Sequence, residues 1–466
     1  MRYISTRGRA PERDFTGVLL AGLAEDGGLY MPAEWPRLSP DDLRALRGLP
    51  YADLAARVIA PFAAPEIPLA TLQSLCRDAY RGFGHPATAP LVQLGPDLWL
   101  LELFHGPTLA FKDFGLQLLA RLFEHALAAR GGRIAIVGAT SGDTGSAAIE
   151  ACRGRAGIDI AILHPEGRTS EVQRRQMTTV LAPNVANLAV AGSFDDCQDL
   201  LKAMFADAPF REEVHLAAVN SINWARIAAQ IAYYVAAGVA LGAPDRPVCF
   251  AVPTGNFGNV FAAWASQAIG LPVARLVAGT NRNDILARFL AANDMSVRPV
   301  EPSLSPSMDI QVSSNFERLA FELLDRDAAA TTLMMQNFRT TGRMAVPSAA
   351  WARARAAMAG FAVDDAATEQ EIRRVHAETG MLVDPHTAIG IAAARAHPTP
   401  GVPTIVAATA HPAKFPDAVE RATGIRPPLP PPLADLYERD ERFARIRPDL
   451  AEAEAAIRGL VRRNHA

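Results

Sequence analysis

Cysteine is scarce in this chain, and its few cysteines form none of the patterns that bind metals or build disulfide frameworks. Four occur among 466 residues, with no CxxC pair and no cysteine–histidine spacing typical of zinc. We therefore expect reduced thiols in packed positions and no metal site. The four are Cys76, Cys152, Cys197 and Cys249.

The chain also lacks an excess of charge of either sign and any long apolar run. Its 46 Lys and Arg face 49 Asp and Glu, a net charge of −3, so we expect neither nucleic acid nor a membrane as a partner. No apolar run approaches the ~20 residues that cross a bilayer. Residues 1–8 lack the apolar core of a secretory signal. We therefore expect a cytoplasmic protein that holds any anionic ligand by a local site.

Short apolar segments alternate with Ala-rich helical segments from Arg133 onward. This pattern indicates buried parallel strands joined by crossover helices. Earlier in the chain, Ser39 followed by Asp41 and Asp42 predicts a helix start. We predict an α/β fold with two open, mostly parallel sheet domains flanked by helices, plus an N-terminal mainly helical region. The predicted strands lie within 133–139, 158–165, 185–192, 213–219, 247–255, 274–280 and 403–410.

The chain divides into four predicted parts. Residues 1–95 form an N-terminal region that packs on the catalytic core. Residues 96–135 and 245–425 form a large domain, and 136–244 form a small α/β domain. Residues 426–466 form a Pro-rich, extended connector and a polar C-terminal helix.

A glycine-containing loop follows the predicted strand at 247–255 and opens a helix at once. Its glycines permit positive φ and a close backbone approach, and amides at a helix start favour an oxygen-rich anion such as phosphate. The loop lacks the Walker A pattern and the GxGxxG spacing of a nicotinamide dehydrogenase. A tight turn without a ligand is the alternative. The loop comprises Gly255, Asn256, Phe257, Gly258 and Asn259.

A second loop between strand and helix is rich in hydroxyl groups. Side-chain oxygens and free amides at a helix N-terminus can hold a carboxylate or a phosphate. The alternative is a helix start that is capped and binds nothing. The loop comprises Thr140, Ser141, Gly142, Asp143 and Thr144.

Two further residues have the chemistry of a cofactor site. Lys112 stands between Phe111 and Asp113 at the head of a predicted helix, where desolvation and the helix dipole lower an amine's pKa and favour Schiff-base chemistry. Thr409 ends a predicted strand, where its hydroxyl can contact a cofactor ring. An exposed lysine and a simple β-former are the alternatives. His411 and Lys414 are interpreted as residues that order the following loop.

Together these features meet the needs of pyridoxal phosphate (PLP): a lysine for its aldehyde, a phosphate loop, a ring-nitrogen partner and a site for a substrate carboxylate. The chain also resembles the threonine synthase family within the fold-type-II, tryptophan synthase β-like PLP enzymes. The resemblance covers residues 2 to about 425, and the Pro-rich C-terminal segment lies outside it. The shared segments are YISTRG, EDGGLYMP, LFHGPTLAFKDFG, GATSGDTGSAA, NSINWARI, VPTGNFGN, DPHTAIG and ATAHPAKFP.

The resemblance implies a role for each matching position. Lys112 matches the Schiff-base lysine, 255–259 the cofactor-phosphate loop, Thr409 the partner of the pyridine nitrogen, and 141–144 the loop that receives the substrate carboxylate. Many fold-type-II enzymes carry Asn at the position of Asp143, which leaves the contact to the cofactor's ring hydroxyl open. That contact, or the substrate phosphate, is assigned to the segment 220–226, with Asn223 and Arg226 as candidates. Further candidates for the substrate phosphate are Arg168, Arg174 and Arg175.

The implied reaction converts O-phospho-L-homoserine and water into L-threonine and phosphate, with Lys112 as the proton carrier. A phospholyase that releases phosphate, ammonia and a keto acid is one alternative, and an inert PLP-binding regulatory protein is another. The intact Lys112 and 255–259 loop argue against the inert protein. Both a monomer and a homodimer are compatible with the sequence.

Overall fold

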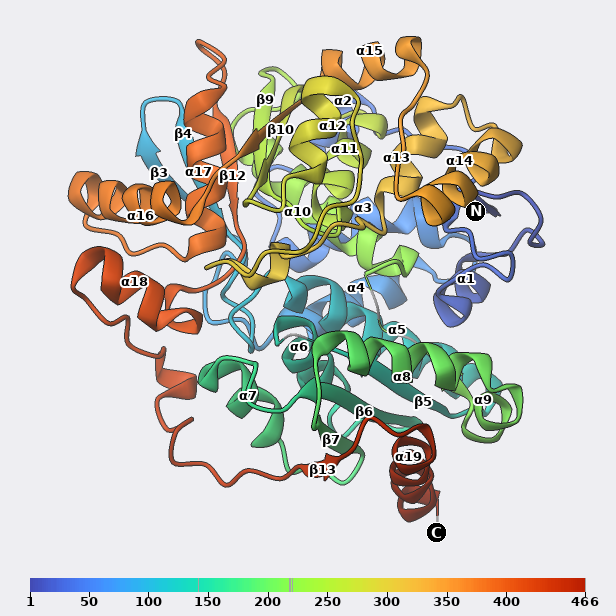
Figure 1. The fold of residues 1–466 in the computed structure, drawn as a ribbon. Helices are drawn as coiled ribbons and strands as arrows, with labels where there is room; N and C mark the ends of the chain where they lie inside the picture. Colours follow the sequence, from blue (N-terminus) through green and yellow to red (C-terminus); the bar gives the residue numbers. More distant parts are fainter. Residues whose placement is uncertain (141, 218, 220, 466) are drawn as a thin grey trace.

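The computed structural model describes the chain except for residues 141, 218, 220 and 466. Its larger sheet has six strands in the order β11–β10–β9–β12–β4–β3, all parallel except β3, which is antiparallel to β4. This sheet lies in the upper part of the molecule in Figure 1. Its strands are β3 (Leu91–Gly95), β4 (Leu98–Glu102), β9 (Val248–Pro253), β10 (Val273–Thr280), β11 (Met358–Ala362) and β12 (Thr404–Ala408).

The smaller sheet has five strands in the order β13–β7–β6–β5–β8, and all of them are parallel. It lies below the larger sheet in Figure 1. Every residue of its central strand β6 is buried, as expected for a parallel strand covered on both faces. The strands are β5 (Ile134–Ala139), β6 (Ile158–Pro165), β7 (Val185–Val190), β8 (Leu216–Ala217) and β13 (Ala444–Ile446).

The N-terminal region consists of a two-stranded antiparallel ribbon and four helices. Its helix α3 packs against α4 and α10, and the Arg7 guanidinium lies 2.9 Å from the buried Glu317 carboxylate. The region therefore packs directly on helices of the larger part. Its elements are β1 (Tyr3–Ser5), α1 (Phe15–Ala21), β2 (Tyr30–Pro32), α2 (Pro40–Ala45), α3 (Tyr51–Ala63) and α4 (Leu69–Tyr80).

The remaining helices cover the two sheets. Helix α17 packs on the strands β9, β10 and β12 and helix α11 on β9 and β10, while α8 and α19 cover the small sheet. These helices are α5 (Lys112–Arg130), α6 (Asp143–Cys152), α7 (Glu171–Thr178), α8 (Phe194–Ala206), α9 (Ala208–Val214), α10 (Trp224–Ala240), α11 (Gly258–Ala268), α12 (Ile285–Ala292), η1 (Pro306–Met308), α13 (Phe316–Leu323), α14 (Ala328–Thr341), α15 (Ser348–Ala357), α16 (Asp365–Thr379), α17 (Pro385–Ala396), η2 (Pro412–Lys414), α18 (Pro416–Thr423), η3 (Pro431–Leu433) and α19 (Leu450–His465).

The predicted fold class is confirmed, and each of the seven predicted segments overlaps an observed strand. The predicted helix start at Ser39 is also present, as a capping box in which the Ser39 and Asp42 side chains bond each other's backbone N–H. The sequence interpretation had no strand at β1, β2, β3, β4, β11 or β13. Helix α10 lies within the range 136–244 assigned to the small domain, yet it packs on α11, α3 and α5.

The C-terminal segment joins the small sheet. After α18 the chain crosses from the upper to the lower part (Figure 1), and β13 pairs in parallel with β7, with Ala444 opposite Leu188. Helix α19 then packs on α8 and on β6 and β7. The sequence predicted a connector and a helix here. The structure adds a strand, β13, that belongs to the small sheet. Within the described residues, no helix is both long and apolar enough to span a membrane.

Strand direction decides where the loops meet. Because β4, β9 and β12 are parallel neighbours, the loops after them leave the same edge of the large sheet. These loops carry Lys112, residues 254–258 and Thr409. In parallel α/β sheets ligands bind at this carboxyl edge.

Candidate active site

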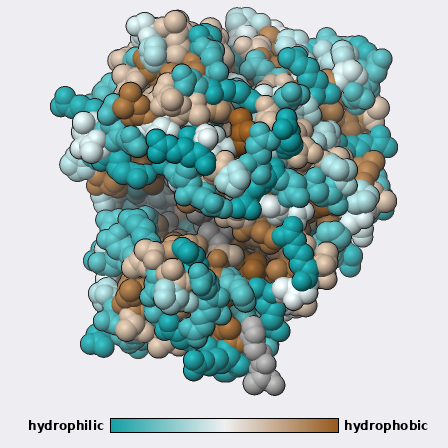
Figure 2. Space-filling model, turned by 90° about the vertical axis from the view of Figure 1, so that its right-hand side faces the viewer, coloured by the Kyte–Doolittle hydropathy of each residue, from teal (hydrophilic) through white to brown (hydrophobic). Residues whose placement is uncertain are grey.

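A cavity lies where these loops meet the start of α6 from the small sheet. Figure 2 shows a recess between the upper and lower parts of the molecule. The cavity contains an amine, a carboxylate, hydroxyl groups, an imidazole and a glycine-rich backbone turn. It is lined by Phe111, Lys112, Asp143, Pro253, Thr254, Gly255, Asn256, Phe257, Gly258, Asn259, Ser307, Met308, His386, Thr409 and Ala410.

Lys112 begins α5 and is buried in this cavity. Its Nζ lies 5.1 Å from the centre of the Phe111 ring, 3.2 Å from Asp143 Oδ2 and 3.4 Å from Ser307 Oγ. Burial lowers the pKa of Lys112, and the nearby charge of Lys414 lowers it further, although Asp143 opposes the shift. This environment increases the fraction of neutral amine, the form that acts as nucleophile and base.

Asp143 is bonded to two lysines from the large domain side of the cavity. Its Oδ2 faces Lys112, while its Oδ1 lies 2.8 Å from Lys414 Nζ and accepts a hydrogen bond from Gln173 Nε2 at 2.9 Å. Burial alone would raise the pKa of Asp143, but the Lys112 and Lys414 charges outweigh burial and hold it well below its ordinary value. Asp143 is therefore a buried carboxylate anion.

The loop 255–259 forms a tight turn between β9 and α11. Phe257 has φ of 64°, in the left-handed region, and a Cβ on Gly255 would lie 2.7 Å from the Ser307 carbonyl oxygen. Asn259 Oδ1 accepts hydrogen bonds from the Tyr233 and Tyr234 hydroxyls. Among the described residues, the buried Asn259 Nδ2 has no hydrogen-bond partner. The loop thus places a donor and a close backbone turn in the cavity.

The second predicted loop contributes only part of its residues to the cavity. Asp143 lines it, whereas the Thr140 hydroxyl accepts hydrogen bonds from the Gly142 and Gly145 N–H groups and so shapes the turn before α6. A Cβ on Gly142 would clash with the Gln173 side chain. Thr144 is half-buried, and Ser141 lies outside the described residues.

Two predicted ligand residues lie away from the cavity lining. Asn223 caps α10, since its Oδ1 accepts from the Ala225 N–H and its Nδ2 donates to the Leu19 carbonyl. Arg226 is buried and donates to the Val219 carbonyl at 3.1 Å. Burial lowers the pKa of Arg226 to about 10. The structure therefore gives both residues internal partners and does not bring them to the cavity lining.

The other arginine candidates either form ion pairs within the protein or are exposed. Arg174 and Arg175 both form ion pairs with Glu441, which lies in the C-terminal segment, and Arg175 also pairs with Glu171. Arg168 is exposed. None of the three lines the cavity.

The structure adds three residues that the sequence interpretation did not place in the site: Ser307, His386 and Lys414. His386 lies in the shared segment DPHTAIG and Lys414 in ATAHPAKFP, so each stood in a segment that carried a signal. Ser307 stands in an irregular segment that carries no local pattern. Lys414 is fully buried and forms an ion pair with Asp143, a contact to the second loop that the sequence interpretation did not predict.

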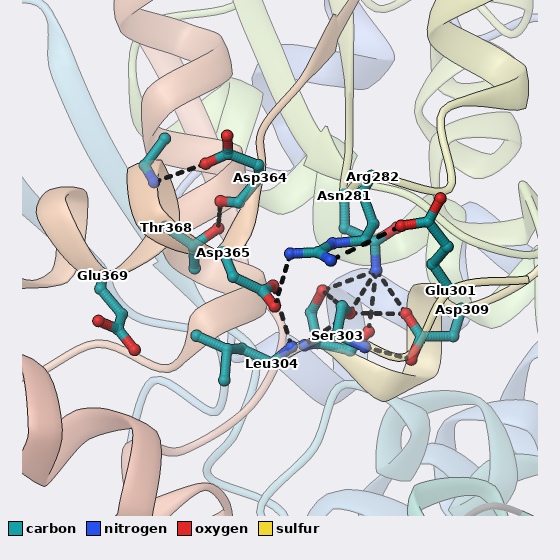
Figure 3. A network of polar contacts seen from close by, with 12 residues as sticks. Asn281, Arg282, Glu301, Ser303, Leu304, Asp309, Asp364, Asp365, Thr368 and Glu369 are labelled. Carbon is teal, nitrogen blue, oxygen red and sulfur yellow. Dashed lines mark hydrogen bonds and ion pairs between the residues drawn. The ribbon is translucent and has the colours of Figure 1, made fainter.

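A hydrogen-bond network fixes the segment that carries Ser307. Asn281, just after β10, donates from Nδ2 to Ser303 Oγ and to Asp309 Oδ1, each at 2.7 Å. Figure 3 shows this network, together with the ion pair from Arg282 to Asp365 at 3.0 Å. The segment 303–309 is thereby held against the glycine loop.

The residues of the cavity fit pyridoxal phosphate. Lys112 offers a buried amine, and the turn at Gly255 packs so closely on the backbone at Ser307 and Met308 that a Cβ would not fit there. The buried Asn259 Nδ2, which lacks a partner among the described residues, is a donor suited to a phosphate oxygen. The Thr409 hydroxyl lines the same cavity.

The chain matches three family models along its length. Residues 2–80 match "Threonine synthase N terminus", 85–334 match "Pyridoxal-phosphate dependent enzyme", and 387–457 match "Threonine synthase, C-terminal". The third match extends well beyond residue 425. The expectation that the C-terminal segment lies outside the shared pattern is therefore wrong.

Curated relatives and solved structures agree with these matches. The chain is 53% identical to threonine synthase from Pseudomonas aeruginosa, with 98% of each chain covered. It is 39% identical to threonine synthase from Saccharomyces cerevisiae, covering 90% of this chain and 88% of the relative. A PLP-bound threonine synthase structure from Brucella melitensis superposes with a TM-score of 0.97 at 49% identity, covering 99% of this chain and 100% of the other. The expected PLP dependence is confirmed, and the chain belongs to the threonine synthase family of pyridoxal-phosphate-dependent enzymes.

Proposed function

We propose that this chain converts O-phospho-L-homoserine and water into L-threonine and phosphate. The observation that carries the proposal is the buried Lys112 amine, which shares one cavity with the 255–259 turn and the Thr409 hydroxyl in a member of the threonine synthase family. We further propose a cytoplasmic protein, as a monomer or homodimer, that does not bind nucleic acid.

In the proposed site, Lys112 holds the cofactor's aldehyde, the loop 255–259 its phosphate and Thr409 its pyridine nitrogen. When bound, pyridoxal phosphate supplies an electron sink for carbanion chemistry at the substrate's α- and β-carbons. A hydroxyl such as Thr409 leaves that nitrogen largely unprotonated, whereas a carboxylate there would stabilise its protonated form.

Lys112 is the proposed proton carrier. Its lowered pKa favours a neutral amine that takes the α-proton, releases it, and in its neutral form again takes a β-proton. Loss of the β-proton allows the γ-phosphate to leave. Proton return to the γ-carbon and addition of water at the β-carbon complete the reaction.

The start of α6 is the proposed site for the substrate carboxylate. The Asp143 side chain is itself an anion paired with Lys112 and Lys414. It is therefore no ligand for the substrate carboxylate. The favourable donors are the backbone N–H groups of the first helical turn, with the hydroxyl groups of Thr144 and Ser141. These assignments rest on loop geometry and on the family pattern.

The test is an absorbance spectrum of purified protein, wild type beside Lys112→Ala, followed by addition of O-phospho-L-homoserine. We expect a band near ~410–420 nm, altered in the variant, and equal amounts of phosphate and threonine from the wild type. Phosphate with a keto acid and ammonia in place of threonine would identify a phospholyase. Absence of the band after addition of PLP would refute the cofactor assignment.

A further inference from the structure

Arg318 is a buried cation in α13 that pairs with no carboxylate of the described residues. It is fully buried, and the neighbouring Glu317 is bonded to Thr6 and Arg7 instead. All hydrogen bonds from the Arg318 side chain go to neutral carbonyl oxygens. Burial lowers the pKa of Arg318 to about 9, so the group is still charged at neutral pH. Because a buried charge without a counter-ion is costly, this arrangement indicates that the cation serves a nearby site.

The guanidinium of Arg318 joins segments that are distant in sequence. Its Nη2 donates to the Ile222 carbonyl at 2.6 Å and to the Tyr30 carbonyl at 3.2 Å, and its Nε donates to the Tyr30 carbonyl at 3.3 Å. Its Nη1 donates to Asn315 Oδ1. Arg318 thus connects the N-terminal strand β2 and the chain before α10 to the residue that precedes α13.

Asn315 in turn holds the 255–259 loop. It is fully buried, and both its backbone N–H and its Nδ2 donate to the Asn256 carbonyl at 3.1 Å. An amide that accepts a hydrogen bond from a cation becomes a stronger donor, because successive hydrogen bonds polarise one another. The Arg318 charge therefore strengthens the bond that fixes the Asn256 carbonyl.

The peptide between Asn256 and Phe257 is trans, since the cis peptides of the chain lie elsewhere. In a planar trans peptide the carbonyl and the N–H point in opposite directions, so the Phe257 N–H points away from Asn315. No described residue accepts a hydrogen bond from that N–H, although Asn256 and Phe257 both line the cavity. Fixing the carbonyl thus leaves an N–H donor on the other side of the peptide for a ligand.

We propose that Arg318 is a positioning residue for the cofactor's phosphate, acting through Asn315 on the Asn256–Phe257 peptide. This inference rests on the proposed function, which assigns the phosphate to the 255–259 loop. Arg318 does not line the cavity. It holds the peptide in the orientation that offers the Phe257 N–H, and its charge polarises that donor through the chain of hydrogen bonds. Arg318 therefore contributes to the affinity for the phosphate and not for the ring or the aldehyde.

The test compares two ligands of the full-length protein after removal of bound cofactor: pyridoxal phosphate and pyridoxal, which lacks the phosphate. Absorbance titration gives both dissociation constants, and we define the phosphate preference as the constant for pyridoxal divided by that for pyridoxal phosphate. Arg318→Met should lower this preference about tenfold or more, as expected for loss of a hydrogen bond from a charged group. The dissociation constant for pyridoxal should change little. A general loss of structure would raise both constants together and leave the preference unchanged.

Three further variants complete the design. Asn315→Ala removes the residue between Arg318 and the loop and should lower the preference in the same direction. The double variant Arg318→Met/Asn315→Ala should show less than the sum of the two effects, since both residues act in one network. Arg318→Lys keeps the charge but not the planar fork, and its preference should lie between those of wild type and Arg318→Met.

The matched control is Arg326→Met. The Arg326 guanidinium also anchors the N-terminal region, since it donates to the Pro32 and Ala33 carbonyls, and its removal should keep the wild-type preference. The proposal is overturned if Arg318→Met keeps that preference or if Arg326→Met lowers it equally. If Arg318→Met does not fold, Arg318→Lys and Asn315→Ala decide, and a wild-type preference in both overturns the proposal.

A failure of the proposed function gives a different result. A wild-type protein that binds pyridoxal as tightly as pyridoxal phosphate contradicts the assignment of the phosphate to the 255–259 loop. A wild-type protein that prefers pyridoxal phosphate, beside an Arg318→Met protein with the same preference, contradicts only the role of Arg318.

Discussion

The Lys414 ammonium lies 2.8 Å from Asp143 Oδ1, and this ion pair joins loops of the two sheets. Asp143 opens α6 after β5, while Lys414 lies in η2 after β12. Lys414 is fully buried and also donates to the Thr108 carbonyl at 2.8 Å. When Lys112 is joined to the cofactor, Lys414 remains as a cationic partner for the buried Asp143 carboxylate.

Replacing Lys414 by Met should therefore destabilise the protein. Loss of one partner of a buried ion pair costs about 3–5 kcal/mol in the free energy of unfolding, measured by denaturant titration. The double variant Lys414→Met/Asp143→Asn should recover part of the loss. Lys202→Met, which removes an exposed pair with Asp199, should cost less than about 1 kcal/mol. A Lys414→Met protein as stable as wild type would show that Asp143 does not depend on Lys414.

Gly255→Ala should weaken cofactor binding about tenfold or more. A Cβ there would lie 2.7 Å from the Ser307 carbonyl oxygen, and because that atom belongs to the backbone, the loop or the segment must move. Absorbance titration with pyridoxal phosphate measures the dissociation constant. Gly82→Ala is the control, since a Cβ on Gly82 meets nothing within 4 Å. Equal affinity of Gly255→Ala and wild type would argue against the proposed phosphate loop.

Asp113 should make stability depend on pH in the acid range. Burial raises its pKa to about 6, although the Thr108 hydroxyl and N–H donate to it. Between the unfolded value of about 3.8 and the folded value, the native protein binds one more proton than the unfolded chain. The contribution of Asp113 to the free energy of unfolding is therefore full below pH ~3.8 and is lost as the pH rises through 6.

The comparison that tests this prediction is Asp113→Asn against wild type at pH 5 and pH 7. Between these values the difference in unfolding free energy should shift by about 1 kcal/mol in favour of the variant. A difference that is the same at both pH values would show that Asp113 does not titrate in this range.

Asn281→Ala should weaken cofactor binding from outside the cavity. Its Nδ2 bonds Ser303 and Asp309 (Figure 3), so its loss frees the segment that carries Ser307. We expect a several-fold higher dissociation constant for the cofactor and faster proteolysis within 301–309. Arg282→Ala removes a partly exposed ion pair next to Asn281. It should change the dissociation constant and the rate of proteolysis only slightly. If both variants bind the cofactor like wild type, the network does not position this part of the site.

Some of the site could be predicted because its signals are local. The segment 255–259 and Thr409 each follow an apolar strand, and Lys112 stands beside aromatic residues at a helix start. Parallel strands place their following loops at one edge, so these three features were expected together, and the structure brings them to one cavity. The assignment of each to a part of the cofactor remains a prediction.

The sequence by itself therefore determined the parallel α/β character, the strand–loop–helix units and the place of Lys112 at a helix start beside Phe111, because these depend on residues adjacent in the chain. Only the tertiary structure decided that Ser307 and His386 line the same cavity and that Lys414 pairs with Asp143 beside it, because these residues come from segments that are distant in sequence. It also decided that Asn223 and Arg226 turn inward and that the short strand β13 completes the small sheet. Three residues carry too little pattern to predict a strand, and pairing with β7 is what fixes it.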